Sequence, residues 1–233
     1  MVMQKQQVSS MSFTNKEGKL IVLNIIDTIQ KHKDYLSEID GAIGDGDHGI
    51  NMNKGVTIAK SQVDKNETLS EALCTLSCVL MEKIGGSMGP LYGSIFMGMQ
   101  AALGNAEYIN GAIIEKMLKQ AYDNIQMISP AKPGDKTLVD VLAPAVSAYA
   151  SVFEKTQDTC AALTACSQAA EEGMQATCDM QAKLGRASRL KEKSIGHQDA
   201  GATSCCLILQ TFCSTIIALE KASRKETGDA AIC

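Results

Sequence analysis

The sequence predicts an all-α protein, with about eight helices packed as a bundle in a single domain. Apolar residues recur at three- and four-residue steps through most of the 233-residue chain. Helix-capping signals and breakers that contain Gly or Pro separate these segments. No segment shows the alternation that is typical of a half-buried strand. Because the connections are mostly short, we expect neighbouring helices to be antiparallel.

Four helices are expected in the N-terminal half. Thr14-x-x-Glu17 and Thr68-x-x-Glu71 are capping boxes, in which the first and fourth side chains each accept a hydrogen bond from the other residue's backbone N–H. With the apolar periodicity, they place helices from Thr14 to about Ile29, from Met52 to Val63, from Thr68 to Ile84, and from about Tyr92 to Leu103.

The C-terminal half is expected to add four more. Asn110 could cap a helix that runs to about Ile125, and Ser129–Gly134 is a clear break. The remaining helices are expected at about Thr137–Phe153 with a kink at Pro144, Thr159–Lys183 and Ala202–Ser223, with a basic loop at Leu184–Gly201. We expect residues 1–12 to be a disordered leader, residues 13–223 to form the domain, and residues 224–233 to be a frayed tail.

Composition narrows the class of protein. The formal net charge of −4 gives no reason to expect a nucleic-acid or membrane partner. No apolar run reaches the ~20 residues that a bilayer requires, and the N-terminus lacks the apolar core of a secretory signal. The nine cysteines include no C-x-x-C pair and no His at zinc-ligand spacing, so we expect mainly reduced core thiols in a cytoplasmic protein.

The most informative segment is the acidic, glycine-rich stretch Ile39–Asn51. Asp40, Asp45 and Asp47 repel one another unless a cation lies among them, and Mg²⁺ prefers carboxylate oxygens while keeping positions open for phosphate. The alternative is a solvated acidic turn or an Asp cap for the next helix. An EF-hand is excluded, because the twelfth position counted from Asp45 is Val56 rather than Glu.

Two further features of this segment suit an anion. Gly49-Ile50-Asn51 opens a helix, whose free N–H groups and dipole attract negative charge. His48 is equally well interpreted as a contact to phosphate or base, or as a local hydrogen-bonding residue.

Other loops carry weaker signals. Gly85–Gly93 could cradle phosphate with help from Ser87, or be a flexible turn. Gly134-Asp135-Lys136-Thr137 fails the phosphate-loop pattern, since Asp135 intervenes and no strand precedes it, so Thr137 is expected to cap a helix. In the basic loop, Arg186 suits bidentate phosphate binding, or is a surface charge.

Taken together, these loops resemble the ADP-binding L subunits of dihydroxyacetone kinases and the equivalent C-terminal domain of single-chain, ATP-dependent members. The resemblance runs from about Phe13 to Leu219. It depends on five ordered motifs: Gly44-Asp45-Gly46-Asp47-His48-Gly49 with Asn51 and Asn53, Gly85-Gly86 with Gly89-Pro90-Leu91, Pro133–Thr137, Gly185–Ser188, and Ser194–Asp199.

The resemblance implies an antiparallel eight-helix barrel with a nucleotide, ADP or ATP, held at one end through two Mg²⁺ ions. It assigns the metal to Asp40, Asp45 and Asp47, and gives these acids and Arg186 the catalytic roles. It assigns nucleotide contacts to His48, Gly49, Ile50, Asn51, Ser87, Met88, Ser129, Leu138, Arg186, Asp199, Ala200 and Gly201. Met88 and Ala200 depart from the family pattern, where a hydroxyl residue and Pro are usual, and both departures favour looser retention.

The resemblance also implies phosphoryl transfer to dihydroxyacetone held by a separate K subunit. In one version, resident ADP is rephosphorylated by a phosphoenolpyruvate-fed phosphocarrier of the phosphotransferase system; a separate L chain favours this version. In the other, ATP exchanges as a substrate for dihydroxyacetone or for a related keto-sugar such as erythrulose. A non-catalytic, nucleotide-sensing module is a third alternative, and a homodimer is left open.

Overall fold

The computed structural model describes residues 12–227, and within this range the chain is almost entirely helical. The helices are α1 (Asn15–Lys31), α2 (Lys33–Ile43), α3 (His48–Val63), α4 (Leu69–Lys83), α5 (Met88–Leu103), α6 (Gly111–Ile128), α7 (Val139–Thr156), α8 (Thr159–Ala176) and α9 (Ala200–Thr227). Two short 3₁₀ helices, η1 (Thr177–Asp179) and η2 (Ala187–Ser194), precede α9. The strands β1 (Ser12–Thr14) and β2 (Tyr108–Asn110) form a small antiparallel pair.

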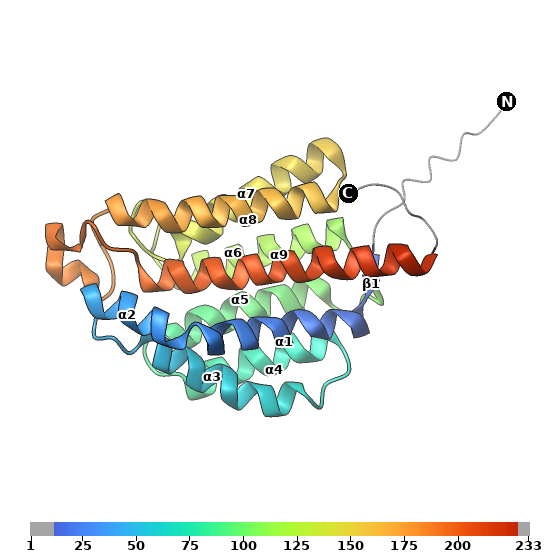
Figure 1. Ribbon diagram of the computed structural model, residues 1–233, viewed down its shortest axis with the longest axis horizontal. Helices are drawn as coiled ribbons and strands as arrows, with labels where there is room; N and C mark the ends of the chain where they lie inside the picture. The colour runs from blue at the N-terminus through green and yellow to red at the C-terminus, as the bar shows by residue number, and fades with distance from the viewer. Residues whose placement is uncertain (1–11, 228–233) are drawn as a thin grey trace.

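The helices close into a barrel (Figure 1). Neighbours around the ring are α1, α4, α5, α6, α7, α8 and α9, and α9 packs back against α1. The helix α3 packs beside α1 and α4. The expected all-α barrel is therefore confirmed.

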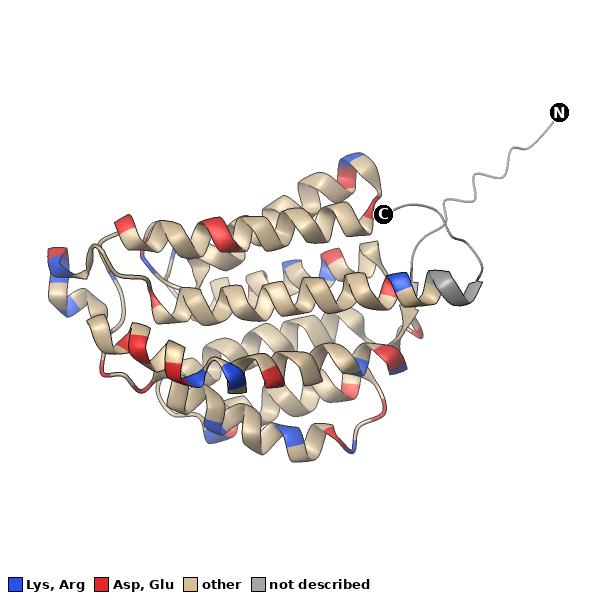
Figure 2. Ribbon diagram, viewed as in Figure 1, with Lys and Arg blue, Asp and Glu red and all other residues tan. Residues whose placement is uncertain are grey.

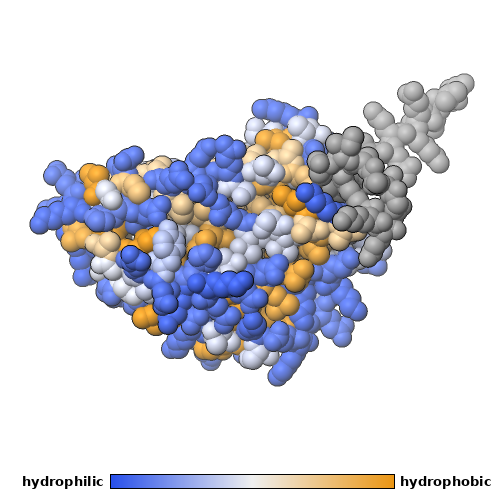
Figure 3. Space-filling model, viewed as in Figure 1, coloured by the Kyte–Doolittle hydropathy of each residue, from blue (hydrophilic) through white to orange (hydrophobic). Residues whose placement is uncertain are grey.

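Burial of apolar faces holds the ring together. In α1 the side chains of Ile21, Ile25, Ile26 and Ile29 are almost fully buried, at the three- and four-residue spacing of one helix face. The visible surface is mainly hydrophilic, with small apolar areas between polar side chains (Figure 3). The predicted caps are also present: Thr14 and Thr68 complete capping boxes, and Asn110 accepts the N–H of Ile113.

The helix α2 was missed by the sequence analysis, which assigned Ile39–Ile43 to a loop. Leu36 and Ile43 are buried on the inner face of α2. We infer that this burial outweighs the cost of about 1 kcal/mol that a helical glycine such as Gly41 incurs. The acidic connection is consequently only four residues long, from Gly44 to Asp47.

Other expected boundaries also shift. The strands β1 and β2 were not expected, because three residues are too few to show the alternation of a strand. Phe13 and Ile109 are buried in this pair, and Ser12 belongs to β1 rather than to a leader. The expected helix to Lys183 is wrong: α8 ends at Ala176, where buried Thr177 accepts the Asp199 N–H (3.1 Å) and turns the chain.

The C-terminal helix is longer than expected. It begins at Ala200 and reaches Thr227, so residues 224–227 are helical rather than frayed. The rest of the expected tail and the expected leader before Ser12 lie outside the described residues. The helix α7 continues through Pro144.

Among residues 12–227, one helix, α9, is long and apolar enough to cross a membrane by length and composition. The expectation that no apolar run is long enough therefore does not hold for this helix. However, 61% of the relevant window in Ala200–Ser223 is buried, and α9 packs against α1 and α8. This burial is what a core helix requires.

The cysteines largely follow the expectation of core residues. Cys166, Cys205, Cys206 and Cys213 are buried between helices, where burial raises the pKa of the Cys206 thiol to about 12. Cys74 and Cys78 differ, because both are exposed on α4.

Candidate functional site

A cavity of about 670 Å³ opens at one end of the barrel. Its walls come from the α2–α3 and α4–α5 connections, the segment after α6, the start of α7, the basic loop and the start of α9. This end is on the left in Figure 1, opposite the end at which β1 lies. Segments that are far apart in the sequence therefore meet at one cavity.

Most of the predicted site residues line this cavity: Asp40, Asp45, Asp47, His48, Asn51, Ser87, Met88, Ser129, Leu138, Arg186, Asp199, Ala200 and Gly201. Gly49 and Ile50 do not. A Cβ atom on Gly49 would lie 1.9 Å from the Lys33 carbonyl oxygen, so this glycine permits close packing of α3 on α2. The side chain of Ile50 is 54% exposed.

The three acids converge, as the sequence analysis expected. Asp40 lies in the last turn of α2, and Asp45 and Asp47 lie in the connection that follows. One carboxylate oxygen from each can be chosen so that all three lie within 4.8 Å of one another. Three hard oxygen donors at this spacing suit a divalent cation such as Mg²⁺.

Glycine allows this connection to be tight. A Cβ atom on Gly44 would lie 2.3 Å from Asp40 Oδ1, so a larger residue would push that carboxylate aside. Gly46 has φ +75°, a left-handed conformation that favours glycine. The backbone N–H of His48 donates to Asp40 Oδ2 (3.2 Å), which ties the acid to the start of α3.

Arg186 reaches these acids from the basic loop. It forms ion pairs with Asp45 and, at 3.4 Å, with Asp47. The side chains of all three residues are about half exposed. Arg186 therefore faces the acids at the cavity mouth and is not an isolated surface charge. The basic loop projects at this end with its cations (Figure 2).

Two of the helices that begin at the cavity, α3 and α5, leave their first turn without a side-chain cap. The caps of α3 and α5 are Asp47 and Ser87, and neither makes a side-chain capping bond. The first-turn N–H groups of such helices attract anions. The helix α5 begins at Met88, earlier than expected, and a Cβ atom on Gly89 would lie 2.4 Å from the Ile84 carbonyl oxygen.

His48 lines the cavity and is also a buried hydrogen-bonding residue, so its two interpreted roles are not exclusive. Its Nε2 lies 2.8 Å from Ser204 Oγ, and burial lowers the pKa of His48 to about 4, although nearby Asp40 opposes the shift. Tyr92 completes the network: its hydroxyl donates to the Gly201 carbonyl (2.9 Å) and contacts Ser204 Oγ (2.5 Å). Sequence reasoning missed Tyr92 and Ser204, because each looks like an ordinary position within an apolar helix.

Sequence reasoning also missed Lys136, which lines the cavity although its side chain is almost fully buried. Thr137 is not the cap that the sequence analysis expected, since the cap position of α7 is Leu138. Thr137 instead accepts the Val139 N–H through its hydroxyl (3.2 Å).

A family model described as the DAK2 domain matches residues 42–214 of the chain. The chain belongs to the DAK2 domain family. The match spans the second half of the acidic stretch, the glycine-rich loop and the basic loop, so the DAK2 domain contains nearly all of the cavity.

Relatives of this DAK2 domain include subunits of similar length. The chain is 36% identical over 186 residues to the PEP-dependent dihydroxyacetone kinase, ADP-binding subunit DhaL of Escherichia coli (strain K12), covering 79% of this chain and 89% of that one. It is 34% identical over 190 residues to the PTS-dependent dihydroxyacetone kinase, ADP-binding subunit DhaL of Lactococcus lactis, covering 81% and 91%.

Longer relatives contain the DAK2 domain as one part. The chain is 31% identical to the D-erythrulose kinase of Mycolicibacterium smegmatis over 188 residues, but these span only 32% of that protein. A crystal structure of the dihydroxyacetone kinase of C. freundii has a TM-score of 0.65 and 20% identity, covering 92% of this chain and 38% of that one. At this identity the likeness shows a shared fold.

Proposed function

We propose that this DAK2 domain is the ADP/ATP-binding subunit of a dihydroxyacetone kinase. The observation that carries the proposal is the convergence of Asp40, Asp45 and Asp47 beside two helix starts, with Arg186 on the opposite side of a cavity large enough for a nucleotide. The similarity to two ADP-binding subunits, which this chain matches over most of their length, supports it.

In this proposal the three acids hold Mg²⁺, with two ions as the family resemblance implies. Bound Mg²⁺ would neutralise phosphate oxygens, and the carboxylates would fix its place in the cavity. The starts of α3 and α5 would orient the phosphates through N–H groups, and Arg186 would stabilise charge that develops during transfer. The dihydroxyacetone kinase from C. freundii, which shares this fold, has a crystal structure in complex with AMP-PNP and Mg²⁺, and this supports the same pair of ligands here.

Nucleotide contacts are proposed along the same wall. His48 and Asn51 would act from α3, Ser87 and Met88 from α5, and Arg186 from the basic loop. Ser129, Leu138, Asp199, Ala200 and Gly201 would complete the enclosure, since all of them line the cavity. Gly49 and Ile50 would act through the backbone of the first turn of α3. Gly49 packs against α2, and the side chain of Ile50 is exposed rather than in the cavity lining.

The phosphoryl donor is proposed to be a phosphoenolpyruvate-fed phosphocarrier subunit, with ADP kept as a resident cofactor. The acceptor would be dihydroxyacetone held by a separate K subunit, and the setting cytoplasmic. The donor proposal is favoured by relatives named as PEP-dependent or PTS-dependent subunits. The likeness to the erythrulose kinase keeps an ATP-dependent subunit for a related keto-sugar as a second candidate.

The test is reconstitution with a K subunit and dihydroxyacetone. We expect Mg²⁺-dependent ADP binding in calorimetry, and phosphoryl transfer when a phosphoenolpyruvate-fed carrier is supplied. Many turnovers with free ATP alone, saturating as for an ordinary substrate, would favour the second candidate. Absence of any Mg²⁺-dependent nucleotide binding would contradict both, and binding without transfer to any K subunit would favour a nucleotide-sensing module.

A further inference from the structure

Lys136 is a charged residue in an unusual position. Lys136 is about 1% exposed. Its backbone has φ +61°, in the left-handed region that residues other than Gly rarely adopt. Asp140 holds this turn, because its carboxylate accepts the N–H groups of Gly134 (2.5 Å) and Thr137 (2.7 Å). The turn therefore fixes the direction in which the lysine enters the interior.

The buried ammonium group donates three hydrogen bonds, all to backbone carbonyl oxygens. These belong to Met180 (3.1 Å), Ser194 (2.6 Å) and His197 (2.6 Å). An ammonium has three donors, so its capacity is used. Lys136 is consequently not available as a direct phosphate ligand, in contrast to the lysine of a phosphate loop.

The three carbonyls lie on either side of the segment that carries Arg186. Met180 lies before that segment, and Ser194 and His197 lie where the chain returns to α9. Two more hydrogen bonds join the two ends of the basic loop, which we call its base. Ser194 Oγ accepts the Ala182 N–H (2.9 Å), and the Gly196 N–H donates to the Cys178 carbonyl (2.7 Å). One side chain thus joins both ends of the basic loop.

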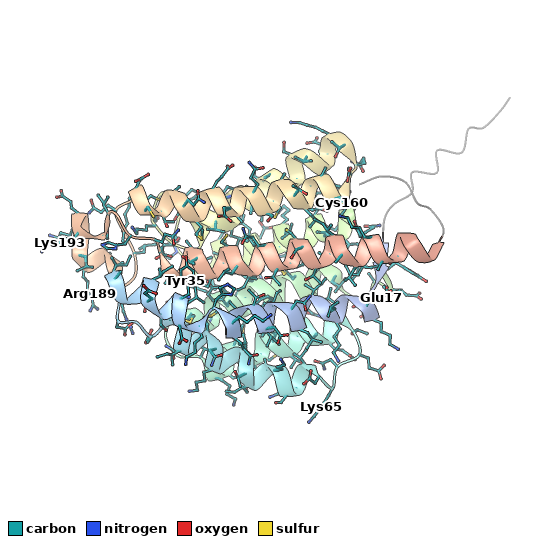
Figure 4. The ribbon with its side chains drawn as sticks, in the orientation of Figure 1. Glu17, Tyr35, Lys65, Cys160, Arg189 and Lys193 are labelled. Atoms are coloured by element: carbon teal, nitrogen blue, oxygen red, sulfur yellow. The ribbon has the colours of Figure 1, made fainter. Side chains whose placement is uncertain are left out.

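Beyond this base the loop is open to solvent. Arg189 and Lys193 are exposed and lie at the outer end of the molecule, away from the barrel (Figure 4). Arg186 turns the other way, toward Asp45 and Asp47. The position of Arg186 over the cavity therefore depends on how firmly the two ends of the loop are held.

We propose that Lys136 is a positioning residue, which clasps the two ends of the basic loop and so holds Arg186 over the acids. The effect of this clasp on nucleotide release rests on the proposed function, whereas its effect on the loop does not. The family resemblance gives Lys136 no role, and the present assignment comes from its three carbonyl contacts.

The first test is hydrogen exchange of the protein without added ligand. Lys136→Met keeps the length of the side chain and removes its three donors. We expect the amides from Ala182 to Gly196 to exchange about tenfold faster or more, while those in the middle of α1 and α9 change little. Lys132→Met, an exposed lysine of the same turn, is the matched control and should leave the loop unchanged. Unchanged exchange of the loop in Lys136→Met would overturn the proposal.

The second test is a double-mutant cycle on the rate of Mg–ADP release. Lys136→Met and Arg186→Lys should each accelerate release about tenfold, but the double variant should be little faster than either one, because Arg186 contributes only when the loop is held. Multiplying effects would indicate a merely structural lysine and overturn the proposal. If the unmodified protein binds no Mg–ADP, the proposed function fails. Hydrogen exchange of the ligand-free protein still tests whether Lys136 holds the two ends of the basic loop together.

Lys136→Met leaves three buried carbonyls without their donor, so this variant could fail to fold. In that case Lys136→Gln keeps an N–H donor on a shorter side chain, so it weakens the same three contacts without removing every donor. We expect faster exchange over the same loop and faster Mg–ADP release. A folded Lys136→Gln protein with both quantities unchanged would overturn the proposal.

Discussion

Replacing one carboxylate of the acidic group should separate ligand binding from folding. In Asp47→Asn, one charge is removed from a group whose oxygens lie within 4.8 Å of one another. At that distance in water, each repulsive pair costs about 1 kcal/mol. The lost ion pair with Arg186, at 3.4 Å between half-exposed side chains, has a similar size and opposite sign. Asp47→Asn relieves two such repulsive pairs and loses one ion pair, so we expect the free energy of unfolding without ligand to rise by about 1 kcal/mol.

The response to nucleotide should change much more. At a concentration about 100 times the dissociation constant, a ligand stabilises the folded state by about 2.7 kcal/mol. If the missing carboxylate weakens Mg–ADP binding about a hundredfold, the gain falls to about 0.4 kcal/mol at the same concentration. For a chain of this size, that loss corresponds to roughly 5–9 °C in the ligand-induced shift of the melting temperature.

Thermal unfolding with Mg–ADP, and again with EDTA, measures both quantities. Asp34→Asn is the matched control, because Asp34 lies on α2, just before the acidic connection, with a side chain that is 98% exposed and pairs only loosely with Lys33. The control should keep the full ligand-induced shift. An unchanged shift in Asp47→Asn, or a loss of more than about 2 kcal/mol without ligand, would refute the metal assignment.

Three further predictions follow from the site. Arg186→Lys keeps the charge but loses the planar fork, so transfer should slow at least about tenfold in a reconstituted assay, and equal rates would return Arg186 to a surface role. Gly49→Ala should lower the free energy of unfolding by about 2 kcal/mol or more in urea, because its methyl group would overlap the Lys33 carbonyl, whereas Gly85→Ala, with open space around it, should be nearly neutral. Burial raises the pKa of Asp199 to about 6, so the folded state binds more protons than the unfolded state between pH ~4 and ~6. The contribution of Asp199 to the free energy of unfolding therefore falls as pH rises through this window. Asp199→Asn should remove that fall, and an unchanged pH profile of unfolding would contradict it.

The sequence predicted the helices well where a face is buried over several turns. The capping boxes at Thr14 and Thr68 also predicted helix starts correctly, because each depends on residues only three positions apart. The prediction failed where tertiary contacts decide. Whether Ile39–Ile43 is helix or loop depends on burial of Ile43 against the barrel, and α8 stops at Thr177 because that hydroxyl is bonded to Asp199, far along the chain.

The candidate site shows the same division. The acids are recognisable because they crowd one short segment, and Arg186 because it lies in a distinctive basic, glycine-containing segment. Lys136, Tyr92 and Ser204 are different, since their importance comes from partners that are distant in sequence. No local pattern marks a lysine whose three acceptors lie more than forty residues away.

The pairing of Arg186 with Asp45 and Asp47 makes the basic loop and the acidic connection mutual counter-ions. A divalent cation that binds these carboxylates has to compete with the guanidinium group for the same oxygens. The competition would couple the two events: cation binding would release Arg186 toward an incoming phosphate, and loss of the cation would draw it back. The apparent cation affinity would then depend on whether an anionic ligand is present to receive the arginine.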